Sequence, residues 1–182
     1  MTAPRSLAEA PARDDLQVVT FGLGREVFAV PVVLVREILD YQVPSHMPGG
    51  PVHFLGLTDV RGQGVPTLDF RRRLGLPSVE PTLATRIIIL DVPLPDRTLA
   101  LGVVIDRVLA VVTVPVDRIE AAPDIGTAWN AGFVQGVVRE ADGFIVILDL
   151  PRIFAGDDPV HAAGTATVEN AAGGRLAMST AA

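Results

Sequence analysis

Asp69 and Asp149 are the first candidates for chemistry, because they stand at matching places in the chain. Each follows a run of strand-forming residues and precedes a short helical turn. Two such carboxylates could act as general acid and base in a hydrolase. The Asp-Thr-Gly or Asp-Ser-Gly turn of an aspartic protease is absent, however, and an aspartate at a helix start accepts backbone N–H bonds. We therefore predict helix caps, and a hydrolase is the less favoured alternative.

The other reactive side chains are few and form no recognisable site. The chain has no cysteine and no lysine, which excludes thiol nucleophiles, disulfides, thiolate metal sites and Schiff bases. His46 and His53 flank a Gly-Gly-Pro loop without the further ligands that a metal site needs. Ser45 beside His46 lacks the Gly-x-Ser-x-Gly turn of a hydrolase nucleophile. We predict no catalytic residue, no metal site and no cofactor.

Charge and hydropathy restrict the partners. A net charge of -6 over 182 residues argues against nucleic acid as a partner. No apolar run reaches the roughly 18 residues that span a bilayer, and the first residues do not form a signal peptide. We therefore expect a cytoplasmic protein without direct membrane insertion. Residues 71–73 are the only basic cluster, which we interpret as a solvated helical face, with a surface for an acidic partner as the minority alternative.

Short β-strands separated by turns are the dominant pattern between two tails, 1–15 and 156–182, which we expect to be disordered. Residues 32–39, which follow Pro31, are an exception. They are apolar at nearly every position and predict a short helix. That helix would either fill the core or line a groove for a partner helix. The expected strands cover residues 16–21, 27–30, 54–60, 65–70, 86–92, 99–105, 108–114, 133–139 and 144–150.

An internal repeat appears when the chain is shifted by 80 residues. Identical residues then align without a gap: Gly56 with Gly136, Leu68–Asp69 with Leu148–Asp149, and Arg72 with Arg152. A duplicated hairpin followed by a helical turn indicates two similar lobes. We predict one domain over residues 16–155, with lobes at about 16–80 and 81–155 or with strands exchanged between them. About five short strands per lobe is the size of a small closed barrel.

Several motifs, in their order and spacing, resemble the CheW family of bacterial chemotaxis coupling proteins. The likeness runs from about residue 16 to residue 155. One departure is Asp59, where the family usually has Asn. The matching stretches are Val35–Arg36–Glu37–Ile38, Thr58–Asp59–Val60–Arg61–Gly62, Val65–Pro66, Leu68–Asp69, Leu101–Gly102–Val103–Val104–Ile105–Asp106 and Ile147–Leu148–Asp149–Leu150.

The resemblance implies a fold and a function. The fold is mainly β, with two side-by-side five-stranded SH3-like β-barrel lobes and short helices. The function is that of a non-enzymatic adaptor, which couples chemoreceptors to a CheA-type histidine kinase in arrays on the inner face of the membrane. Its partners would be the kinase regulatory domain and the cytoplasmic tip of methyl-accepting chemoreceptors. Candidate partner-binding residues are Val35, Glu37, Ile38, Gly56, Asp59, Arg61 and Gly62.

Two other functions remain open at this point. A small-ligand-binding β-barrel would need a polar-lined cavity, whereas the strands here are rich in Ile, Val and Leu. A CheW-like scaffold in a non-motility chemosensory pathway would share the same motifs.

Overall fold

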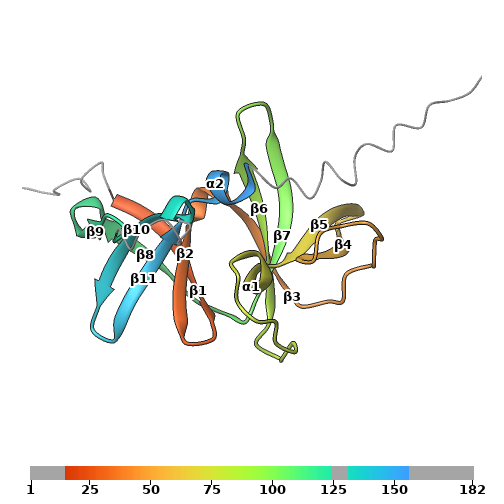
Figure 1. Cartoon of the computed structure of the whole chain (residues 1–182), viewed down its shortest axis with the longest axis horizontal. Helices are drawn as coiled ribbons and strands as arrows, with labels where there is room; N and C mark the ends of the chain where they lie inside the picture. The colour runs from red at the N-terminus through yellow and green to blue at the C-terminus, as the bar shows by residue number, and fades with distance from the viewer. Residues whose placement is uncertain (1–14, 124–130, 156–182) are drawn as a thin grey trace, which may run out of the picture.

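A computed structural model describes residues 15–123 and 131–155, and short β-strands form most of it (Figure 1). The mainly β fold expected from the sequence is confirmed. The strands are β1 (Asp15–Leu23), β2 (Glu26–Pro31), β3 (Val35–Asp40), β4 (Phe54–Val60), β5 (Gln63–Asp69), β6 (Arg86–Pro93), β7 (Thr98–Ile105), β8 (Arg107–Pro115), β9 (Ile119–Glu120), β10 (Val134–Glu140) and β11 (Gly143–Leu148). The helical turns are η1 (Val32–Leu34), α1 (Phe70–Arg73), η2 (Val116–Arg118), η3 (Ala131–Phe133) and α2 (Leu150–Phe154).

The strands form two sheets that lie side by side (Figure 1). The first sheet has the order β8-β1-β2-β11-β10-β9, and the second has the order β3-β6-β7-β5-β4. Neighbouring strands are antiparallel except for β11 with β2 and β5 with β7, which are parallel. In the first sheet, the parallel pair connects the β10–β11 hairpin to the β1–β2 hairpin. In the second sheet, it connects the β4–β5 hairpin to the β6–β7 hairpin.

The lobes do not follow the order of the chain. The first sheet combines the first two strands with the last four, whereas the second sheet contains only β3 to β7. The two sheets therefore do not divide at residue 80, and the alternative in which the lobes exchange strands agrees with the sheet order. The reason is that β2 pairs with β11, so the N-terminal hairpin takes its partners from the far end of the chain. Strand exchange between the two halves describes this arrangement.

Both sheets bend round until their edges meet, which makes each a small barrel. In the second sheet, the chain beyond β3 returns to β4, where Ser45 and Leu57 exchange hydrogen bonds of 2.7 and 2.9 Å. In the first sheet, the chain beyond β8 passes through η2 into β9, where Glu120 lies opposite Val137. Closure of this kind removes the unpaired edges of an open sheet.

The repeated glycines Gly56 and Gly136 stand where the barrels close. A Cβ atom on Gly56 would lie 2.0 Å from the Ser45 carbonyl oxygen, and the φ of Gly56 is +138°. A Cβ atom on Gly136 would lie 3.0 Å from the carbonyl oxygen of Glu120. Only glycine allows such a close backbone approach. The repeated glycines therefore allow the same close backbone approach where each of the two barrels closes.

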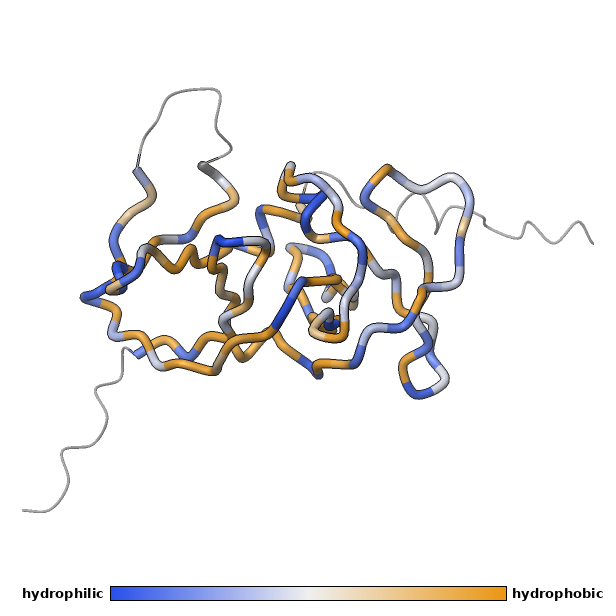
Figure 2. The backbone as a smooth tube through the Cα atoms, turned by 90° about the horizontal axis from the view of Figure 1, so that it is seen from below, coloured by the Kyte–Doolittle hydropathy of each residue, from blue (hydrophilic) through white to orange (hydrophobic). Residues whose placement is uncertain are grey.

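The largest hydrophobic cluster lies between the sheets, and smaller clusters fill each barrel. Phe70 links the shared cluster, with ring centroids 5.9 Å from Phe21 and 6.5 Å from Phe154. Along β6, Ile88 belongs to this cluster, whereas Ile87 faces the interior of the second barrel. Because both faces of β6 are covered at its centre, residues 87–90 form an unbroken apolar run. Figure 2 shows apolar residues along the strands and hydrophilic residues at many turns.

Residues 32–39 do not form the predicted helix. After Pro31, the chain makes the single turn η1 and then continues as β3, which pairs with β6. The segment contains β-branched residues in close succession, and these favour extended structure. Exposure alternates along β3, so Val35 packs against the shared cluster while Ile38 is exposed. The segment therefore contributes to the core on one face and to the surface on the other.

The capping prediction is confirmed at both aspartates. The Oδ1 atom of Asp69 accepts the Arg72 N–H at 3.2 Å, and that of Asp149 accepts the Arg152 N–H at 3.0 Å. Each carboxylate thus satisfies a donor at the start of a one-turn helix. The two aspartates lie at the ends of strands in different barrels, which gives no support to the hydrolase alternative.

Candidate partner-binding surfaces

Closure of the second barrel brings two predicted site residues together. Glu37 is on β3 and Arg61 is in the turn after β4, and these strands are the opposite edges of the sheet. The Arg61 Nη2 atom lies 3.4 Å from the Glu37 Oε2 atom, with the Arg61 side chain 83% exposed. An exposed pair of this kind contributes about 0–1 kcal/mol to stability. Arg61 can therefore exchange this contact for a partner at little cost, and it pairs with Glu37 rather than with Asp59.

The turn between β4 and β5 holds Arg61 in an unusual conformation. Val60 pairs with Gln63, so the turn has two residues, Arg61 and Gly62, with φ of +54° and +84°. Positive φ at both positions is typical of a type I′ turn, whose twist suits a hairpin. Within the described part of the chain, Arg61 is the only non-glycine residue with positive φ. The turn projects this arginine from the hairpin tip.

Asp59 stabilises the same turn. Its Oδ1 atom accepts the Gly62 N–H at 2.8 Å. An asparagine carbonyl oxygen could accept the same bond, so this contact does not require the acid. Asp59 in place of the family's Asn is therefore compatible with the local geometry, and what the substitution adds is one negative charge on an exposed surface.

Ile38 supplies exposed apolar surface on the face of β3 opposite to Glu37, because the two residues are neighbours on the strand. Its side chain is 38% exposed, and the adjoining exposed positions of β3 are both in ion pairs. Arg36 donates from Nε to Asp91 at 3.0 Å, and Asp40 lies 3.3 Å from Arg86. The hydrogen bond to Asp91 raises the pKa of the Arg36 guanidinium above its usual value. We call Glu37, Ile38, Asp59, Arg61 and Gly62 the β3–β4 patch.

Two predicted site residues lie beneath this surface. Gly56 is buried under the Ser45 carbonyl, as barrel closure requires. Val35 is half-buried against the shared hydrophobic cluster. Both residues shape the second barrel, and a direct contact of either with a partner stays a prediction.

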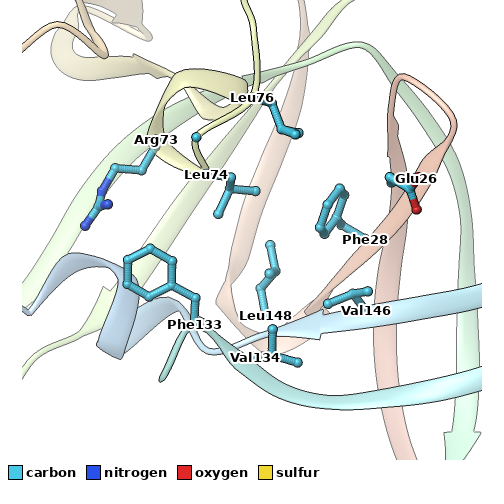
Figure 3. A pocket seen from close by; sticks show the side chains of 10 residues that line it. Glu26, Phe28, Arg73, Leu74, Leu76, Phe133, Val134, Val146 and Leu148 are labelled. Carbon is cyan, nitrogen blue, oxygen red and sulfur yellow. The ribbon is translucent and has the colours of Figure 1, made fainter. Parts of the chain in front are cut away.

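A groove between the barrels was not predicted (Figure 3). Its volume is about 540 Å³, and most of its lining is apolar. The sequence gives no signal for it, because its walls come from β2, the chain after α1, and the η3–β10–β11 region. The lining residues of this interbarrel groove are Glu26, Phe28, Arg73, Leu74, Gly75, Leu76, Phe133, Val134, Val146 and Leu148.

The basic cluster at residues 71–73 is not the predicted solvated face. Arg71 forms a 2.6 Å ion pair with Asp106, and its side chain is mostly buried. Arg72 donates to the Val52 carbonyl at 3.0 Å. Arg73 points toward the first barrel, where it contacts Phe133. The prediction failed because consecutive residues of a helix are rotated by about 100° from one another, so the three side chains leave α1 in different directions.

The remaining candidates add little. Among residues 15–123 and 131–155, no three His, Asp or Glu side chains are grouped to hold a metal ion. Over the same residues, no helix is long and apolar enough to cross a membrane. Trp129 lies outside the described residues, as do residues 1–14 and 156–182 of the predicted tails, whereas Asp15, predicted to belong to the first tail, begins β1.

Two closed barrels that share a core and present distinct surfaces define an interaction domain. Comparison with known proteins identifies the family of this domain. Residues 17–158 match the CheW-like domain. The chemotaxis protein CheW of Rhizobium meliloti (strain 1021) is 30% identical over 142 residues, covering 78% of this chain and 89% of that protein. CheW of Treponema pallidum (strain Nichols) is 28% identical, covering 78% and 84%.

A solved structure has the same fold. The crystal structure of the scaffolding protein TtCheW from Thermoanaerobacter tengcongensis matches with a TM-score of 0.68 and 23% identity, covering 82% of this chain and 94% of that one. The chain therefore belongs to the CheW-like family. It is a CheW-like protein of chemotaxis and not an enzyme.

Proposed function

We propose that this protein couples chemoreceptors to a CheA-type histidine kinase, by binding the kinase regulatory domain and the cytoplasmic receptor tip at the inner face of the membrane. The observation that carries the proposal is the presence of two different surfaces in one domain of the CheW-like family. One is the β3–β4 patch, and the other is the interbarrel groove. Two surfaces allow one small protein to hold two partners together.

The interbarrel groove suits a helical partner. Its apolar walls include Phe28 and Phe133, and an amphipathic helix can bury its apolar face in such a groove. The receptor tip that the family binds is a helical hairpin. We therefore assign the receptor tip to the groove.

The β3–β4 patch suits the kinase domain. It presents the exposed Arg61, and arginine is a common anchor in protein interfaces. Coupling then needs only that the partners' active and inactive states bind with different affinity. No chemical step by this protein is required.

Reconstitution tests the proposal. The full chain is mixed with a CheA-type kinase and a soluble receptor-tip fragment, and binding is measured by calorimetry alongside kinase autophosphorylation. We expect micromolar or tighter binding to each partner and a change in kinase activity only when all three are present. Absence of binding to both partners, with kinase activity unchanged, would contradict coupling in that pathway.

The same assay tests the alternative function in a non-motility pathway. A non-motility CheW-like scaffold would act on the kinase of its own pathway, so kinases from both kinds of pathway are compared. The ligand-barrel alternative finds no support, because Val18, Val138 and Ile147 fill the first barrel and Ile87 and Ile89 fill the second.

A further inference from the structure

Arg73 bridges the two barrels beside the groove. It is the last residue of α1, which follows β5 of the second barrel. Its Nη2 group donates to the carbonyl of Ile153 in α2, which follows β11 of the first barrel. Its guanidinium carbon lies 5.0 Å from the ring centroid of Phe133 and 5.9 Å from that of Phe154. One side chain thus holds a hydrogen bond and two cation–π contacts across the barrel boundary.

Phe133 forms part of the groove wall but stands on a weak element. It ends η3, a turn of three residues, and such turns have little stability of their own. Its backbone is anchored, because its carbonyl accepts the Asp149 N–H at 2.9 Å. Its ring packs against the shared hydrophobic cluster and beside the Arg73 guanidinium, and Figure 3 shows Arg73 and Phe133 side by side at one end of the groove.

The opposite wall begins at the same arginine. Leu74 and Leu76 follow Arg73 directly and face Phe133 and Leu148 across the groove (Figure 3). The Arg73 side chain therefore holds Phe133 in one wall. The Arg73 backbone continues into Leu74 and Leu76 of the other wall. The spacing of the two walls depends on this residue.

We propose that Arg73 is a positioning residue for the interbarrel groove, which orients the Phe133 ring before a partner helix binds. This inference rests on the proposed function of the groove. Preorganisation of this kind lowers the ordering cost of binding, because the ring does not have to be immobilised when the helix arrives. The contact with Phe154 serves the shared core, whereas the contact with Phe133 serves the groove.

A double-mutant cycle separates these two roles. Full-length wild type, Arg73→Met, Phe133→Leu and the double variant are titrated with a soluble receptor-tip hairpin. Arg73→Met keeps the apolar stem and should weaken binding roughly tenfold, as expected for a desolvated cation–π contact. In the Phe133→Leu background it should have no further effect, because the ring it positions is gone.

Arg139 provides a matched control. Its guanidinium lies 4.9 Å from the Phe144 ring on the β10–β11 hairpin, and neither residue lines the groove. Arg139→Met removes the same kind of contact and should leave the dissociation constant unchanged. An equal loss of affinity from Arg73→Met in both backgrounds, or no loss in either, would overturn the positioning role.

Fluorine NMR of protein containing 4-fluorophenylalanine reports the ring directly. The Phe133 signal is assigned by its loss in Phe133→Leu, and we expect Arg73→Met to shift or broaden it. An unchanged signal overturns the inference. If Arg73→Met does not fold, Arg73→Lys is tested in its place, since it keeps the charge but not the planar guanidinium. Failure of wild type to bind the hairpin would contradict the groove assignment alone, and the NMR signal would still decide the role of Arg73.

Discussion

At the residue scale, Arg61 combines exposure with a fixed position. The positive φ and the Asp59 hydrogen bond hold the turn, while the guanidinium forms an exposed pair with Glu37. The backbone of this turn is already fixed before a partner binds, so the ordering cost at this position is confined to the Arg61 side chain. The sequence singled out Arg61 by resemblance, and the structure adds a physical reason why a partner could use it.

Reversing the charge of Arg61 tests this role. Arg61→Glu places a like charge against Glu37 and should weaken binding of the kinase regulatory domain at least roughly tenfold. Stability should change by less than about 1 kcal/mol, because the pair is exposed. Calorimetric titration and urea unfolding measure the two effects. Arg25→Glu, an equal charge change at the exposed tip of the β1–β2 hairpin, is the control. Normal binding by folded Arg61→Glu removes Arg61 from the site.

At the element scale, closure of the second barrel depends on one residue without a side chain. Gly56→Ala would press a Cβ atom against the Ser45 carbonyl and force alanine into a positive φ. We expect a loss of about 3 kcal/mol or more in the free energy of unfolding, from combined backbone strain and overpacking.

Gly62→Ala is the matched control for Gly56→Ala. Gly62 also has positive φ, but a Cβ atom there would meet nothing within 4 Å. Gly62→Ala should lower the free energy of unfolding by about 1–2 kcal/mol, from the left-handed backbone alone. Denaturant unfolding compares the two variants. Equal losses would show that the close approach at Ser45 does not matter for closure.

Local signals explain which elements could be predicted. The Asp69 and Asp149 caps and most hairpins follow from a few adjacent residues, so the sequence was sufficient. β3 was mistaken for a helix because nearly every residue after Pro31 is apolar, and an unbroken apolar run has no period to distinguish strand from helix. Pairing of Glu37 with Arg61 and the walls of the groove depend on barrel closure, which no local pattern encodes.

At the scale of the whole molecule, the two barrels share their largest hydrophobic cluster. Phe21, Phe70 and Phe154 come from the first barrel, α1 and α2 respectively, and all three are fully buried. Neither barrel can keep its part of this cluster covered if the other unfolds. The protein should therefore unfold as one cooperative unit despite its two-barrel form.

Phe70→Ala tests this cooperativity. Truncating a fully buried phenylalanine should cost about 3–5 kcal/mol. We expect amide hydrogen exchange to accelerate by a similar factor in the slowest amides of β1 in the first barrel and of β6 in the second. Faster exchange confined to the second barrel would show that the barrels are separate folding units.

The exchange of strands also imposes an order on synthesis. Every strand of the second barrel lies between residues 35 and 105, so this barrel can close while the ribosome is still making the remainder. The β1–β2 hairpin emerges earlier, yet its neighbours β8 and β11 are translated only after all strands of the second barrel. The β1–β2 hairpin is therefore made before the second barrel but completed after it, and until then the nascent hairpin has its apolar faces uncovered.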